Sequence, residues 1–145
     1  MGLYNYAASV RPPEDWTDPD EDFFLAPEAE AALRAAQAEI EKERDDCFFG
    51  GPYFRGKYVQ NLILEITGVN ISADWIPPET VRMMNDVLSQ CDLEEIIREY
   101  GESDDHGRTA DVLSDLIVFF KICAEHKLGL PSVRTEVEHL MALVD

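Results

Sequence analysis

Three aspartates at alternate positions near the start of the chain have the spacing that calcium-binding loops use. Asp18, Asp20 and Asp22 lie in the segment DPDED, and alternate carboxylates open the ligand set of an EF-hand loop. The later positions do not fit, because the sixth is Phe23 where a glycine makes the turn and the twelfth is Ala29 where a glutamate closes the site. An EF-hand is therefore excluded, and a weak, irregular Ca²⁺ site remains as an alternative.

A second group of potential metal ligands lies in the segment ESDDH at 102–106. Asp104 and Asp105 would bind a cation only if ligands from elsewhere in the fold converged on them, so we expect a polar connection between helices. Cys123 and His126 stand at i and i+3 in a helical pattern, which could begin a transition-metal site. Neither HExxH nor CxxC occurs, and no second pair with metal spacing is present. We expect structural or surface histidines and no cofactor.

The chain contains no complete catalytic motif. GxSxG, P-loop and dinucleotide-binding patterns do not occur. The three cysteines, Cys47, Cys91 and Cys123, are widely spaced, which predicts neither a disulfide framework nor a zinc knuckle. Nothing in the spacing favours a catalytic pairing of Cys47 with His106. An enzyme whose site is dispersed in the sequence therefore stays an alternative to a non-enzymatic protein.

The segment CFFGGPYFRGKY at 47–58 gathers aromatic side chains around turn residues. Glycine permits positive φ and proline restricts the next step, so the segment predicts a turn between two helices. We expect Phe48 and Phe49 to point inward, and Arg55 and Lys57 to pair with acidic groups of the body. A binding role for the outer rim of this turn is the alternative, because Tyr and Arg are the residue types that anchor interfaces.

Acidic residues dominate the charge of the protein. The 145 residues include 30 Asp and Glu against 12 Lys and Arg, giving a formal net charge of −18. Over half of this excess lies in residues 14–46, which hold thirteen acids and three bases. Such a chain repels nucleic-acid phosphates and anionic lipid, so direct binding to either is not expected. The acids could solvate the surface, bind a cation, or face a basic protein.

Helical periodicity and helix-terminating residues predict an all-α protein. No apolar run reaches the roughly 20 residues that cross a bilayer, and no secretory signal opens the chain. We expect an acidic, proline-containing arm over 1–26 packed on the body, and one compact helical domain over 27–145. The predicted helices, about six, cover 27–46, 56–68, 78–90, 93–100, 110–127 and 132–144.

Charge and composition together favour a non-enzymatic interaction protein. Its expected partner is a basic protein, such as a nucleic-acid-binding protein or a nuclease, bound by charge complementarity in the cytoplasm. The expected role is that of an inhibitor, an immunity-type protein or a nucleic-acid mimic. The residues expected to contact the partner are Glu39, Glu43, Asp45, Asp46, Tyr53 and Arg55.

Overall fold

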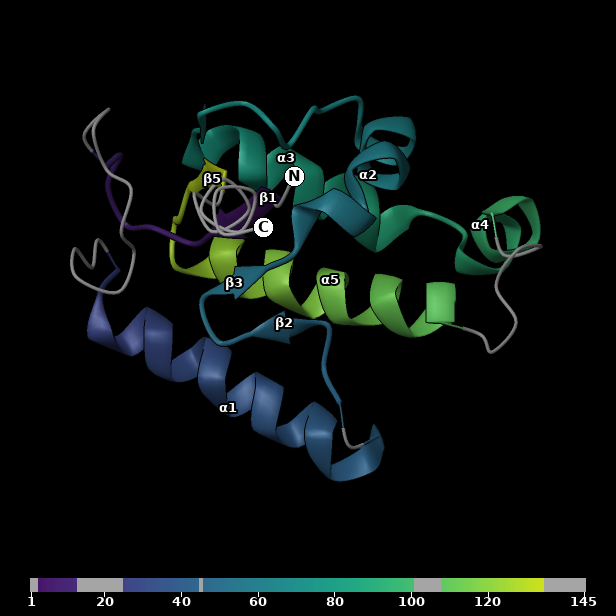
Figure 1. Ribbon diagram of the computed structural model, residues 1–145, viewed down its shortest axis with the longest axis horizontal. Helices are drawn as coiled ribbons and strands as arrows, with labels where there is room; N and C mark the ends of the chain where they lie inside the picture. Colours follow the sequence, from purple (N-terminus) through teal and green to yellow (C-terminus); the bar gives the residue numbers. More distant parts are fainter. Residues whose placement is uncertain (1–2, 13–24, 45, 101–107, 135–145) are drawn as a thin grey trace, which may run out of the picture.

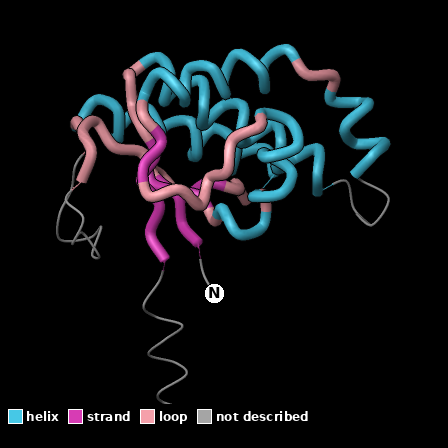
Figure 2. Tube along the Cα trace, turned by 90° about the horizontal axis from the view of Figure 1, so that it is seen from above, coloured by secondary structure: helices cyan, strands magenta, loops and turns pink. Residues whose placement is uncertain are grey.

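The computed structural model describes residues 3–12, 25–44, 46–100 and 108–134, and these parts form a mixed α/β fold (Figure 1). Five α-helices, one 3-10 helix and five short strands make up the described parts. The prediction of an all-α protein is therefore wrong. The five strands build a single antiparallel sheet, which lies on one side of the molecule with most of the helices on the other (Figure 2).

The sheet joins regions that are far apart in the sequence. Its strand order is β2-β3-β1-β5-β4. The strand nearest the N-terminus lies in the middle, where Asn5 stands opposite Phe54 on one side and Ser132 on the other. The strands are β1 (Leu3–Tyr6), β2 (Phe49–Gly50), β3 (Tyr53–Phe54), β4 (Trp75–Ile76) and β5 (Leu130–Arg134). Because all five are only two to five residues long, none produces a clear alternating pattern on its own.

The helices largely follow the predicted segments. They are α1 (Pro27–Arg44), α2 (Gln60–Thr67), α3 (Pro78–Gln90), α4 (Leu93–Tyr100) and α5 (Arg108–Glu125), with the 3-10 helix η1 (Gly56–Tyr58) before α2. Gly68 ends α2 with φ 77°, a left-handed conformation that glycine adopts without strain. Asp92 caps α4, because its side chain accepts the backbone N–H of Glu94 and Glu95. Among the described residues, no helix is both long enough and apolar enough to cross a membrane.

Two predicted helices differ in the structure. The segment 56–68 is divided into η1 and α2, and the first residues of the segment 132–144 continue the strand β5. The rest of that last segment lies outside the described residues. The predicted turn at 47–58 is a β-hairpin: β2 and β3 pair with each other, and Gly51 between them has φ 61°. Pairing within a hairpin satisfies backbone groups that a helical turn would leave to side chains or water.

A cluster of phenylalanine rings forms the centre of the core between the hairpin and α5. Phe49 and Phe54 from the hairpin contact Phe119 with ring centroids 5.3 and 5.1 Å apart, and Phe120 follows on the same helix. All four rings are fully buried. Edge-on contacts of this kind add about 0.5–1.5 kcal/mol per pair beyond the burial of area. The hairpin is therefore held firmly on α5, which positions the loop residues on either side of it.

Candidate functional site

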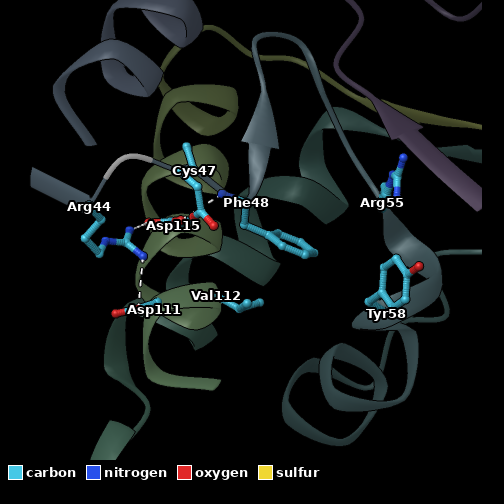
Figure 3. Close-up of a pocket in the computed structure, with 9 residues that line it drawn as sticks. Arg44, Cys47, Phe48, Arg55, Tyr58, Asp111, Val112 and Asp115 are labelled. Atoms are coloured by element: carbon cyan, nitrogen blue, oxygen red, sulfur yellow. Dashed lines mark hydrogen bonds and ion pairs between the residues drawn. The ribbon is translucent and has the colours of Figure 1, made fainter. Parts of the chain in front are cut away.

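A hollow of the described surface lies where the end of α1, the connection to β2, the helix η1 and the first half of α5 meet. It has a volume of about 590 Å³. Arg44 and Asp111 lie at one side, Phe48 and Val112 form the middle, and Tyr58 lies at the opposite side (Figure 3). This size lies within the range of pockets that hold a small ligand, and it leaves room for a long side chain of a partner.

One wall of this pocket is a charged network centred on a buried carboxylate. Asp115 is only 2% exposed. Its Oδ1 pairs with the guanidinium of Arg44, and its Oδ2 accepts the backbone N–H of Phe48 at 2.9 Å. Arg44 also reaches the Asp111 carboxylate at 3.4 Å (Figure 3). Both oxygens of Asp115 are thus occupied, so this carboxylate links α1, the connection and α5 rather than facing a ligand.

The charges in this network affect the protonation of Arg44. Burial alone would lower the pKa of Arg44, but the neighbouring Asp115 and Asp111 carboxylates raise it above its ordinary value. The guanidinium is therefore held in its charged form beside the two acids. Arg44 is the last residue of α1, where a cation also interacts favourably with the helix dipole.

Sequence reasoning missed Arg44, Asp111 and Asp115. A signal was present, because Asp115 lies inside a largely apolar helix, between the buried Leu113 and Phe119. A charged residue at such a position must be paired, since burial of an isolated charge costs several kcal/mol. The sequence alone could not name its partner, because Arg44 lies 71 residues away.

The other wall comes from the end of the hairpin and from η1. Tyr58 is 67% exposed, which is unusual for so large a ring. Arg55 lies over the ring of Tyr4 at 5.8 Å from its centroid, and Tyr53 stacks on Tyr6 with centroids 5.3 Å apart. The rings of Tyr4 and Tyr53 also lie close together, with centroids 5.7 Å apart. The sheet thus carries a patch of tyrosines and one arginine, which ends beside the pocket.

Cys47 lines the pocket but is a poor nucleophile at neutral pH. Its burial raises the pKa of the thiol to about 11, an effect that outweighs the hydrogen bond from the Phe49 backbone. The thiolate is the reactive form of cysteine, so such a thiol stays largely unreactive. The His106 that was considered as its partner lies outside the described residues. Among the described residues that line the pocket, none is therefore an activated nucleophile.

The structure places the predicted contact residues in two groups. Glu39 and Glu43 are exposed on α1, and Asp46 is exposed just after the helix, where it lines the pocket. Tyr53 is half-buried in the tyrosine patch, and Arg55 is exposed between that patch and the pocket. Asp45 lies outside the described residues.

The predictions for the turn are only partly met. Phe49 is fully buried as expected, whereas Phe48 is half-buried in the pocket wall. Arg55 and Lys57 are exposed, and neither has an ion-pair partner within the described ranges.

The metal candidates lie in the acidic arm and in the 102–106 loop. Asp18, Asp20, Asp22, Asp104 and Asp105 all lie outside the described residues. On α5 the sulfur of Cys123 is fully buried, whereas His126 is exposed beyond the end of the helix. Within the described parts of the chain, no group of three or more His, Cys, Asp or Glu side chains could hold a metal ion.

Comparisons with protein-family models, with curated proteins and with solved structures each returned no match to this chain. Its function is therefore inferred from the arrangement of its own side chains.

Proposed function

We propose that the protein is a non-enzymatic interaction protein that binds a basic protein surface by charge complementarity, in an inhibitor, immunity-type or nucleic-acid-mimic role. The observation that carries this proposal is the acidic surface of α1, defined here as the exposed carboxylates of Glu28, Glu39, Glu41 and Glu43. Only Ala29 and Leu33 of this 18-residue helix are buried, so most of its length faces solvent.

The bases of α1 do not cancel this surface. Arg34 pairs with Glu30 at 2.9 Å, and Arg44 is held by the two aspartates of α5. Lys42 pairs with Glu39 at 3.1 Å, but both side chains are more than 70% exposed, so the pair is weak and easily exchanged. A helix of this length extends about 27 Å, which gives a partner several carboxylates to meet at once.

Exposed carboxylates speed the association with a basic partner by attracting it before contact. This attraction extends over about 10 Å at 0.1 M salt, and its range becomes shorter as the salt concentration rises. A net charge of −18 favours a basic partner and disfavours nucleic acid and anionic membranes. The three cysteines are free thiols, which suits a cytoplasmic protein.

The test is a capture experiment with two variants of equal charge. The variant Glu39→Gln, Glu41→Gln, Glu43→Gln neutralises α1, and the control Glu79→Gln, Asp86→Asn, Glu125→Gln removes three exposed carboxylates elsewhere. Each immobilised protein is exposed to host lysate at about 50 mM and about 500 mM salt, and bound proteins are identified by mass spectrometry.

The expected result is one basic protein that the wild type and the control retain at low salt, that high salt releases, and that the α1 variant loses. Equal retention by the α1 variant and the control would refute the proposal that the α1 surface makes the contact. Failure of the wild type to retain any basic protein would refute charge complementarity as the function.

A further inference from the structure

We infer that the pocket between α1, η1 and α5 binds an arginine side chain of the partner. This inference rests on the proposed function, because it assigns the chemistry of one contact within that complex. The pocket begins where α1 ends, since Arg44 and Asp46 both line it. A basic surface that docks on the acidic surface of α1 therefore comes within reach of the pocket.

The charge of the pocket favours a cation. Its lining contains three carboxylates and two arginines, and Asp115 and Arg44 already neutralise each other. Asp46 is exposed and has no ion-pair partner among the described residues. Asp111 is 52% exposed and touches Arg44 only at 3.4 Å, so it can accept a second donor. Two carboxylates of the lining are thus available to a cation.

The middle of the pocket suits the apolar stem of a long side chain. Phe48 and Val112 are half-buried there, and the exposed ring of Tyr58 lies across from them (Figure 3). A guanidinium is planar, stacks on aromatic faces and donates two parallel hydrogen bonds to a carboxylate. Lysine offers a point charge without stacking, so arginine fits this combination of rings and acids better.

Arg55 does not prevent a cation from entering. Its guanidinium lies over the ring of Tyr4, which is not among the residues that line the hollow, and Figure 3 shows the side chain pointing away from Phe48. The other arginine of the lining, Arg44, forms ion pairs with the carboxylates of Asp111 and Asp115. The charge of Arg44 is therefore neutralised within the molecule, and with Arg55 counted the lining keeps an excess of one carboxylate.

The inference can be tested without the natural partner. The probe is the peptide acetyl-Gly-Arg-Gly-amide, and the matched control replaces arginine by citrulline, which has the same shape without the charge. Amide shifts of the isotope-labelled protein are followed by NMR during titration to millimolar concentrations. The expected result is a saturable shift at Cys47, Phe48 and Val112, with the citrulline peptide binding at least about ten times more weakly.

Variants of the pocket then test which groups hold the probe. Tyr58→Ala and Asp46→Asn should each weaken binding of the arginine peptide about 2- to 5-fold. The control Leu64→Ala removes another exposed apolar side chain, outside the pocket, and should leave binding unchanged. Absence of a saturable shift, equal binding of both peptides, or shifts confined to the α1 surface would each overturn the inference.

The two proposals fail in different ways. If Tyr58→Ala and Asp46→Asn retain the captured partner fully while neutralisation of Glu39, Glu41 and Glu43 releases it, the α1 surface is confirmed and the pocket inference is wrong. If the pocket variants lose the arginine peptide but the α1 variant retains the partner, the proposed function of α1 is wrong and the pocket inference stands.

Discussion

The buried carboxylate of Asp115 offers the sharpest test of how this fold is held together. Replacing it by alanine leaves the Phe48 backbone N–H without its acceptor, and an unsatisfied buried donor costs about 1–3 kcal/mol. The change also removes the main partner of Arg44. That side chain is 29% exposed and keeps Asp111 within 3.4 Å, so the cost is below that of a fully buried orphan charge.

Together these terms predict that Asp115→Ala lowers the free energy of unfolding by about 2–4 kcal/mol. For a chain of this size the melting temperature should fall by about 6–15 °C. Urea denaturation followed by circular dichroism measures the free energy, and calorimetry gives the melting temperature. The matched control is Asp111→Asn, one helical turn earlier and 52% exposed, which should cost less than about 1 kcal/mol.

A double-mutant cycle with Arg44→Ala isolates the pair itself. The coupling energy between positions 44 and 115 should be about 1–3 kcal/mol, because the two side chains touch directly. The reasoning is refuted if Asp115→Ala costs no more than Asp111→Asn, or if the coupling energy is near zero. Either result would mean that the helix junction is held by apolar packing alone.

Two substitutions test the packing of the core, and the reactivity of the cysteines tests the burial of the thiols. Gly56→Ala should destabilise the protein by at least about 1–3 kcal/mol in urea denaturation, because a Cβ there would overlap the buried Asn5 side-chain oxygen; an unchanged midpoint would contradict this contact. Phe119→Ala should cost about 3–5 kcal/mol by the same assay, and a loss below about 1 kcal/mol would show that the ring cluster is poorly packed. Alkylation of Cys47 at pH 8 should be about 100-fold slower than in the urea-unfolded chain, and Cys123 slower still, as peptide mapping can show; equal rates would contradict the burial of these thiols. Because folding favours the neutral thiol of Cys47, its contribution to stability is present below pH 9 and is lost as the pH rises toward 11.

The helices could be predicted because their signals are local. An apolar stripe with a proline at its start or a glycine at its end identifies α1, α2 and α3, and Asp92 marks the start of α4. Each of these signals depends on residues within about two turns of each other, and the structure leaves them in place.

The sheet could not be predicted because its strands are defined by distant partners. β1 is four residues long and gains its hydrogen bonds from β3, about fifty residues later, and from β5, near the other end of the described chain. Asn5 of β1 is a buried polar residue, and its side-chain N–H donates to the Ile71 carbonyl at 2.8 Å. A short stretch such as LYNY carries no period long enough to be recognised.

The sequence alone determined the acidic character of this protein and the positions of most of its helices, because charge follows from composition and helices from local periodicity. Tertiary structure decided which charges are available. It brings Arg44 and the buried Asp115, 71 residues apart, into one ion pair, and leaves Glu39, Glu43 and Asp46 in solvent. It also sets Tyr58 across a hollow from Phe48. Such pairings depend on how helices and sheet pack, and packing is a property of contacts between residues that are distant in the chain.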